Sequence, residues 1–269
     1  GYSTMKEKER VVFFLSDGLS AAEKERMTAY GADMSKYLDS GNEARIKKAY
    51  ESRDPRLQMA VITPYAQYNG ASSGIAHTYT LRWPYRGSDS AEPFDIRTDT
   101  NDKFYYLWRK FVPEGLEQTE RDTYGLDIPL IRYAEVLLLK AEALNEWGST
   151  HESEAIRCVN EVRRRAGHVE LNNATYPATK VNGQSDLRER IRNEYYWEVG
   201  GADSMCFHEV RWGTWKDKKF DNNRNGLMQM WGETTYTWYW LGDQCWSWPI
   251  PAKEMEMNSN LEQNEGWIN

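Results

Sequence analysis

The sequence lacks any apolar run of the length that crosses a membrane. Its longest runs, residues 11–15 and 136–139, are far shorter than the roughly 20 residues of a transmembrane helix. It also lacks an excess of basic residues, because 34 Lys and Arg stand against 41 Asp and Glu. Nucleic-acid phosphates and anionic membrane surfaces both attract a basic face, so neither is expected as the main partner.

Cysteine is scarce, and its three positions form no metal-binding spacing. Cys158, Cys206 and Cys245 include no Cys-x-x-Cys pair and no Cys/His spacing, which argues against a zinc site. A single disulfide stays open as an alternative. Cys158 falls on a helical pattern, and we expect it to be a small buried residue.

Other motifs that bind cofactors or metals are also missing. The chain has no phosphate loop and no Gly-x-Ser-x-Gly elbow, and its four histidines are scattered. Residues 221–226 match the first half of a calcium loop, but Gly232 stands at the twelfth position, where the loop requires a Glu. We therefore predict an ordinary turn there, with no cofactor and no metal site.

No carboxylate pair stands in an apolar setting that would mark an acid catalyst. Glycoside hydrolysis requires two carboxylates, one of which has a raised pKa. Glu194 and Glu198 lie one helical turn apart, but arginines surround them in the sequence. This setting favours ion pairs, at the surface or between helices, over catalysis.

Tryptophan and tyrosine, by contrast, are abundant. The chain has 12 Trp and 17 Tyr against 7 Phe, and nine of the Trp lie at or after Trp197. Both rings are amphipathic and are enriched where one side is wet, so this bias fits an exposed binding face. A core filled with Trp would have the same composition, and that alternative stays open.

Residues 129–167 carry the clearest structural pattern. Helical spacing of apolar residues predicts one helix that begins near Pro129 and ends at Gly148, and a second that ends at Gly167. A Ser-x-x-Glu capping box at Ser149 marks the start of the second helix. So short a turn predicts an antiparallel αα-hairpin, close to a tetratricopeptide repeat in length. A third helix is expected over residues 186–199.

The rest of the chain is expected to be irregular, with short strands. Strands are predicted at residues 57–63, 79–83 and 103–111. In the tail, Gly242-Asp243 predicts the turn of an aromatic β-hairpin over residues 234–249. The predicted fold is therefore mainly α with irregular loops and short β-hairpins, in a single domain over residues 1–269.

Four segments match one known pattern, in the same order along the chain. Asp-Pro-Arg stands at 54–56 and Lys-Phe at 110–111, and Ile-Arg-Tyr-Ala-Glu-Val-Leu-Leu at 131–138 leads into Asn-Glu-Val-Arg at 160–163. The tail carries Pro-Ile-Pro at 249–251, Gln-Asn at 263–264 and Gly-Trp at 266–267. Together they resemble the SusD/RagB family of outer-membrane nutrient-binding lipoproteins. The sequence departs from that pattern after the third helix, where Arg211-Trp212 are kept but the usual acid and base pair is absent.

The resemblance implies a non-catalytic cell-surface protein that captures a glycan or similar nutrient for import through a TonB-dependent outer-membrane transporter. It implies that this chain is the C-terminal half of such a protein or a short divergent member. It also implies that the lipid anchor of the full-length protein, facing outward from the outer membrane, lies outside this chain. Two rivals stay open: a helical scaffold that binds only protein, and a carbohydrate-active enzyme.

The ligand site is expected at exposed rings in two regions. Long irregular segments on a rigid scaffold usually carry binding, which singles out the loop region before the helical hairpin. In the tail, alternation along a hairpin would free the face that is opposite Trp246 and Trp248, unless that face packs against the helices. The predicted ligand-binding residues are Tyr79, Arg82, Trp83, Tyr85, Trp231, Trp238 and Trp240.

Overall fold

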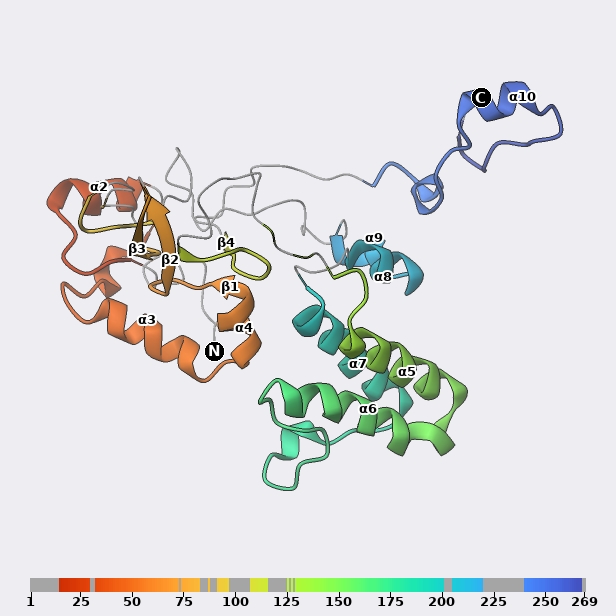
Figure 1. Cartoon of the computed structure of the whole chain (residues 1–269), viewed down its shortest axis with the longest axis horizontal. Coiled ribbons are helices and arrows are strands. Elements are labelled where there is room, and N and C mark those ends of the chain that lie inside the picture. Colours follow the sequence, from red (N-terminus) through yellow and green to blue (C-terminus); the bar gives the residue numbers. More distant parts are fainter. Residues whose placement is uncertain are drawn as a thin grey trace. The chain divides into compact units, whose positions relative to one another are not determined.

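The structure, a computed structural model, forms two compact units, Gly1–Ser204 and Met205–Asn269. It describes residues 15–29, 32–72, 74–82, 87, 91–96, 107–115, 125, 127, 129–200, 205–219 and 240–267. Helices and 3-10 turns dominate the described residues, and the strands are short (Figure 1). The predicted fold class, mainly α with irregular loops and short β elements, is confirmed.

The first helices begin on side-chain caps. Helix α2 (Ala21–Ala29) starts on a capping box: the Ser20 amide donates to Glu23 at 2.8 Å, and the Glu23 amide donates to the Ser20 hydroxyl. The short turn η2 (Met34–Lys36) follows. Helix α3 (Asn42–Glu51) has the carboxylate of Asp17 at its N-terminus, where it accepts from the amide of Asn42 at 2.7 Å. An anion there stabilises the helix dipole.

Helix α4 (Pro55–Ala60) occupies most of a segment predicted as strand. Asp54 accepts a hydrogen bond from the Arg56 amide at 2.9 Å, and Pro55 fits the first helical turn. This cap overrides the strand pattern, so the prediction of a strand over residues 57–63 is wrong for residues 57–60. The strand that remains, β1 (Val61–Ile62), pairs antiparallel with β4 (Leu107–Trp108), which joins Val61 to Trp108.

A second pair of strands forms a hairpin. Strands β2 (Gln67–Ser72) and β3 (Ile75–Thr80) pair antiparallel, with Tyr68 opposite Tyr79. Gly74 has a φ of 77° in the turn, a conformation that favours glycine. The strand predicted over residues 79–83 therefore starts earlier and ends at Thr80, and that predicted over 103–111 is described as strand only at β4.

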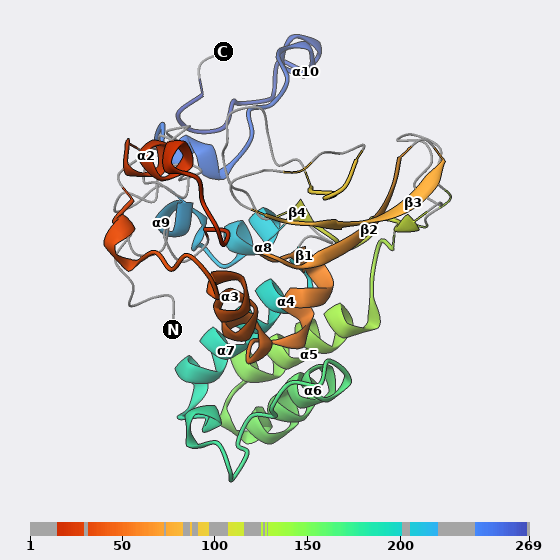
Figure 2. The same cartoon turned by 90° about the vertical axis from the view of Figure 1, so that its left-hand side faces the viewer.

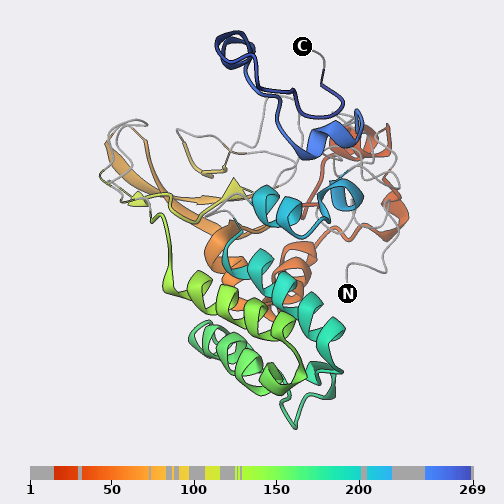
Figure 3. The same ribbon diagram turned by 90° about the vertical axis from the view of Figure 1, so that its right-hand side faces the viewer.

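Three helices pack together at residues 133–198 (Figure 3). Helix α5 (Tyr133–Trp147) and helix α6 (Glu152–Arg165) form the predicted hairpin, and α7 (Gln184–Glu198) packs on both. The buried residues of α5 and α6 include the apolar stripes that helical spacing predicted, among them Leu138 and Val159, together with the polar side chains of Asn145, Asn160 and Arg163. Cys158 is buried as expected, and burial raises the pKa of its thiol. A 3-10 turn, η5 (Pro177–Thr179), precedes α7.

Helix boundaries differ from the prediction in three places. Helix α5 begins after Arg132, so Pro129 lies outside its first turn. Residues Ser149–His151 form a 3-10 turn, η4, and the N-terminus of α6 has no side-chain cap, so the predicted capping box is wrong. Helix α7 starts two residues before the predicted start at 186, after Gly183. Sequence patterns place helix interiors better than their ends.

The second unit contains short helices and an irregular tail. Its elements are α8 (Met205–Arg211), α9 (Trp215–Lys219), the 3-10 turn η6 (Asp243–Trp246) and α10 (Ala252–Met257). The predicted hairpin over 234–249 is wrong over residues 243–246, which are the 3-10 turn instead of the turn and second strand. Residues 234–239 lie outside the described part of the chain.

Side-chain hydrogen bonds join separate segments of the tail to each other. The Gln263 side chain accepts from the Ile250 amide at 2.7 Å and donates to the Ile250 carbonyl at 2.9 Å. The Trp267 indole donates to the Ser247 carbonyl at 2.9 Å. Both residues belong to the tail pattern noted in the sequence, so that pattern has a structural reason.

Two further properties follow from the described residues. The three cysteines, Cys158, Cys206 and Cys245, are not joined to one another by a disulfide bond in the structure. Among the helices that the structure describes, none is long and apolar enough to cross a membrane.

Candidate functional site

Tyr79 is part of a packed cluster and is not an exposed ring. Its side chain is 8% exposed, its ring meets the Phe94 ring edge-on at 5.4 Å, and it covers Gly70 on the paired strand. A Cβ at Gly70 would approach the Tyr79 ring to 2.8 Å. The expectation of an exposed ring at Tyr79 is therefore wrong, because the hairpin register turns this residue toward Phe94.

Arg82, the second predicted ligand residue, is engaged by carboxylates. It pairs with buried Asp95, and its Nε lies 3.6 Å from Glu43 of α3. Asp95 also accepts from the Gly87 amide at 2.8 Å. These contacts give Arg82 a clear structural role in the described structure. Its role in ligand binding stays a prediction.

Trp240 lies in a cluster of three indoles. Its ring centroid is 5.1 Å from that of Trp246 and 5.7 Å from that of Trp215 in α9. The Trp240 Nε1 donates to Asp243 at 3.1 Å, and Lys216 lies 5.5 Å above the ring. Trp240 and Trp246 are thus in contact, so the predicted separation onto opposite faces of a hairpin is wrong.

The remaining predicted positions fall outside the described residues. They are Trp83, Tyr85, Trp231 and Trp238, and residues 221–226 of the calcium-like motif lie outside as well. These positions stay predictions. Within the described residues, no group of three or more His, Cys, Asp or Glu is arranged to hold a metal ion.

Two adjoining pockets near α3, α4, β1 and β4 share Tyr50 as a wall; we call them the Tyr50 groove. One, of about 300 Å³, is mainly apolar and is lined by Tyr50, Arg53, Leu57, Val61 and Trp108. The other, of about 370 Å³, is more polar and is lined by Lys47, Tyr50, Gln58, Thr63, Pro64, Tyr65, Ala66, Gln67 and Arg109. Pockets of this size accommodate small ligands.

Trp108 gives the groove an exposed aromatic surface. Its side chain is 54% exposed although it belongs to strand β4. Gln58 and Gln67, which are exposed, place amide groups on the polar side of the groove. A ring that stacks on an apolar face, next to groups that bond hydroxyls, is the combination that a sugar requires.

The elements around the groove, α3, α4, β1 and β4 (Figure 2), are joined to each other by hydrogen bonds. Besides the β1–β4 pairing, the Arg109 amide donates to the Ala60 carbonyl at 2.9 Å, where α4 ends and β1 begins. The Gln58 side chain donates to the Tyr50 carbonyl at 3.1 Å, which joins α4 to α3. The Arg109 guanidinium donates to the Gln67 carbonyl at 3.3 Å. The groove is therefore largely built before a ligand arrives.

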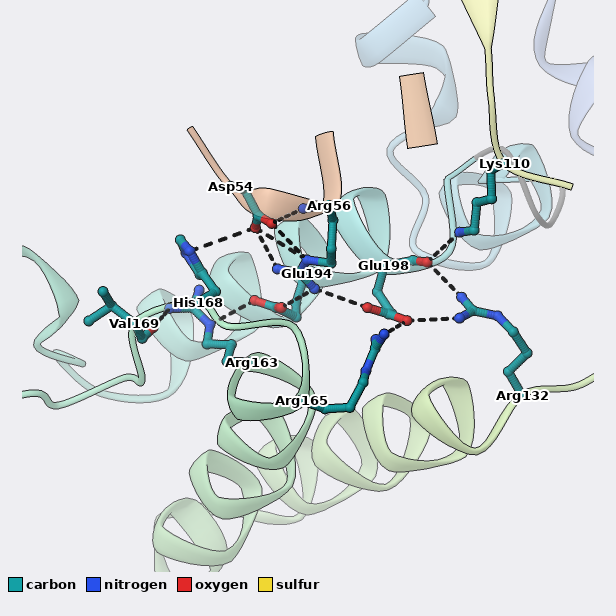
Figure 4. A network of polar contacts seen from close by, with 10 residues as sticks. All are labelled: Asp54, Arg56, Lys110, Arg132, Arg163, Arg165, His168, Val169, Glu194 and Glu198. Atoms are coloured by element: carbon teal, nitrogen blue, oxygen red, sulfur yellow. Dashed lines mark hydrogen bonds and ion pairs between the residues drawn. The ribbon is translucent and has the colours of Figure 1, made fainter. Parts of the chain in front are cut away.

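A buried network of ion pairs anchors α4 to α6 and α7 (Figure 4). Glu194 of α7 is fully buried, and its carboxylate lies 2.7 Å from Arg163 of α6 and 2.7 Å from Arg56 of α4. Arg56 also pairs with Asp54 at 2.6 Å. One buried carboxylate thus joins three helices. The predicted ion pairing of Glu194 is confirmed as a pairing between helices, deep in the unit.

Glu198, one turn later on α7, gathers the remaining cations. Its carboxylate pairs with Arg132 at 2.8 Å and with Arg165, and its backbone carbonyl accepts from Arg132 at 2.6 Å. Lys110 donates to the carbonyls of Glu198 at 2.8 Å and Gly200 at 3.3 Å, so it satisfies the C-terminus of α7. Arg56 is next to the groove residue Leu57, and Lys110 is two positions after the groove residue Trp108. The network therefore anchors both walls of the groove.

The electrostatics of the network favour fixed charges. Burial opposes ionisation of Glu198, but hydrogen bonds from Arg132 and Arg56 outweigh it and lower the pKa of the carboxyl. Burial also opposes ionisation of Asp54, and hydrogen bonds from Arg56 again lower its pKa. A carboxyl with a lowered pKa is a poor proton donor near neutral pH, so Glu198 does not have the property of a glycosidase acid.

Sequence reasoning did not single out Trp108 or the groove. Trp108 fell inside a predicted strand, and a strand does not reveal which of its faces is covered. Asp54, Arg56 and Lys110 were recognised as parts of a pattern without a reason for their presence. The best sign of their importance in the sequence was their order along the chain around the loop region. In the structure, these residues anchor the chain segments on either side of the groove.

Comparisons with known proteins agree on one family. A family model described as the SusD family matches residues 13–267. The starch-binding protein SusD of Bacteroides thetaiotaomicron is 29% identical over 161 residues, which cover 60% of this chain and 25% of that protein. SusD-like protein P38 of Formosa agariphila is 32% identical over 139 residues, covering 51% of this chain and 24% of that protein.

A solved structure of similar description matches part of the chain. The crystal structure of a SusD homolog from Bacteroides thetaiotaomicron has a TM-score of 0.41 and 24% identity, covering 60% of this chain and 32% of that chain. The matched region spans about a quarter of the length of the curated relatives named above.

Proposed function

Because this chain belongs to the SusD family, we propose that it binds an oligosaccharide in the Tyr50 groove and does not cleave it. One observation carries the assignment: the half-exposed ring of Trp108 lines one pocket of the groove, and the second pocket, which shares Tyr50 with the first, is lined by exposed amide side chains. A related protein of Bacteroides thetaiotaomicron is named for binding starch, which supports carbohydrate as the ligand class. The residues predicted from the sequence, among them Arg82 and Trp240, remain candidates for a second contact surface.

The biological setting is part of the same proposal. The full-length protein would face outward from the outer membrane and pass its ligand to a TonB-dependent transporter. Family membership supports this setting. The starch-binding relative is about four times as long as the region of it that matches this chain. Catalysis is not expected, because the best-spaced carboxylates, Glu194 and Glu198, are held in ion pairs.

Calorimetric titration with a panel of soluble glycans tests the binding site. Trp108→Ala should weaken binding of the best glycan by about 1–3 kcal/mol, the scale of losing one well-packed aromatic contact. Trp147→Ala is the matched control, because that Trp is 75% exposed on α5 and does not line the groove.

Two results would contradict this site. If Trp108→Ala folds and binds every glycan as the wild type does, the groove is not the binding site. If the wild type binds no glycan in the panel, the rival function, a scaffold that binds only protein, takes its place.

A further inference from the structure

The two pockets of the Tyr50 groove are built from the same four segments of the chain. Besides Tyr50, which lines both pockets, each segment contributes at least one residue to each of them. With the residue of the apolar pocket first, these are Arg53 and Lys47 at α3 and the turn after it, Leu57 and Gln58 in α4, Val61 and Thr63 at β1, and Trp108 and Arg109 at the end of β4. The groove therefore has an apolar half and a more polar half side by side.

Glu114 fastens the end of β4 to the start of β2. One of its carboxylate oxygens pairs with Arg109, whose guanidinium also donates to the Gln67 carbonyl at 3.3 Å. The other oxygen accepts from the Asn69 amide at 3.2 Å. Arg109 directly follows Trp108, so these contacts hold Gln67 of the polar half in a fixed place relative to Trp108 of the apolar half.

Glu114 makes these contacts from outside the groove. It belongs to the described part of the chain and is not among the residues that line either pocket. A buried hydrogen bond from the Tyr68 hydroxyl to the Pro113 carbonyl, at 2.9 Å, keeps the adjoining backbone against β2. Glu114 can therefore influence a ligand in the groove only through the residues that it holds.

From this arrangement we propose that the two pockets are subsites for neighbouring parts of one glycan chain, and that Glu114 is a positioning residue that sets their spacing. One part of the glycan stacks on Trp108, and the next bonds the amide of Gln67 through its hydroxyls. Because the spacing is fixed, a ligand that fills both pockets does not have to order them. This inference rests on the proposed function, and it adds that the groove selects glycans long enough to fill both pockets.

Calorimetry with matched short and long glycans tests the two subsites. The probes are maltose with maltohexaose, xylobiose with xylohexaose, and mannobiose with mannohexaose. A hexasaccharide that binds should do so at least about tenfold more tightly than its disaccharide, because the second subsite then acts on a ligand already held. Gln67→Ala should weaken the hexasaccharide by about threefold, the scale of one hydrogen bond, and leave the disaccharide unchanged. Trp108→Ala should weaken both.

Variants of Glu114 test its positioning role. Glu114→Ala should weaken the hexasaccharide by about threefold to tenfold and leave the disaccharide unchanged, because only the longer ligand depends on the spacing. Glu114→Gln keeps an acceptor oxygen and the length of the side chain, so it should restore most of the affinity. Glu170→Ala is the matched control, because Glu170 pairs with Arg164 at 2.9 Å and does not line the groove. If thermal unfolding shows that Glu114→Ala does not fold, Glu114→Asp, which is one methylene shorter, replaces it in the same comparison.

The outcomes separate this inference from the proposed function. If Trp108→Ala weakens binding but no hexasaccharide binds more tightly than its disaccharide, the pockets are not joint subsites, and the proposed function stands without the inference. If Glu114→Ala weakens both lengths equally, or neither, Glu114 is not a positioning residue and the inference is overturned. Failure of all three hexasaccharides to bind also overturns it, and the wider glycan panel then decides the proposed function. If Trp108→Ala changes no glycan's affinity, the proposed site itself fails.

Discussion

The pKa of Lys110 is set by the groups around its ammonium. Its ammonium is partly buried against the end of α7 and lies near Arg132 and Arg165. Burial and these neighbouring cations lower its pKa to about 8, and Glu198 only partly opposes them. Two backbone carbonyls hold the ammonium in place, so the residue is an anchor for the strand that carries Trp108.

The titration of Lys110 is the first prediction at this scale. In the unfolded chain its pKa should be the ordinary 10.5, and in the folded protein about 8. Between these values the unfolded chain binds more protons, so this group raises the free energy of unfolding as the pH increases from 8 to 10.5. Nuclear magnetic resonance of methylated lysines, with Lys110→Arg to assign the signal, should show a midpoint near 8. A midpoint at the ordinary value would show that Lys110 is solvated.

Single residues were predictable from the sequence only where local chemistry decided their place. The capping box of Ser20 and Glu23 is of this local kind, because its partners are only three residues apart. The exposure of Tyr79 was predicted wrongly, because it depends on Phe94, which approaches from another segment. Trp108 was missed because a strand pattern does not reveal which of its faces is covered.

At the scale of elements, the αα-hairpin of α5 and α6 was predicted because its information is local. Apolar spacing defined its stripes, and a short turn fixed its packing. The attachment of α4 was not predictable, because Arg56 finds its partner Glu194 across more than a hundred residues of chain. Asp54 and Pro55 also began a helix where hydrophobic pattern alone favoured a strand.

The ion pairs between elements give a stability prediction. Glu194→Gln should lower the free energy of unfolding by about 3–5 kcal/mol, because it leaves Arg56 and Arg163 buried without this carboxylate. The matched control is Glu146→Gln, which breaks a more exposed pair between α5 and Arg188 of α7. That change should cost about 1 kcal/mol or less.

Urea unfolding of both variants measures the difference. Similar losses for Glu194→Gln and Glu146→Gln would show that the central network is as well solvated as a surface pair. In that case it would not be what anchors the groove.

At the scale of the whole chain, the sequence predicted the family and the fold class but did not indicate the Tyr50 groove. The family pattern was recognisable because its segments are short, ordered and chemically constrained, as Gln263 and Trp267 illustrate in the tail. The aromatic hairpin failed because Trp240 and Trp246 meet Trp215, a contact that alternation along a strand does not encode. Composition fitted either a Trp-rich binding surface or a core filled with Trp, and the Trp of the groove, Trp108, lies outside the Trp-rich segment that begins at Trp197.

The central claim is that the Tyr50 groove holds a glycan that the protein leaves intact. The most direct measurement is a glycan titration followed through the indole N–H resonances, with Trp108→Phe and Trp147→Phe to assign two signals. The glycan is then recovered and its chain length determined. The account predicts a saturable shift of the Trp108 signal, a constant Trp147 signal and glycan of unchanged length. A Trp108 signal that stays constant while glycan binds, or recovery of shortened chains, would contradict it.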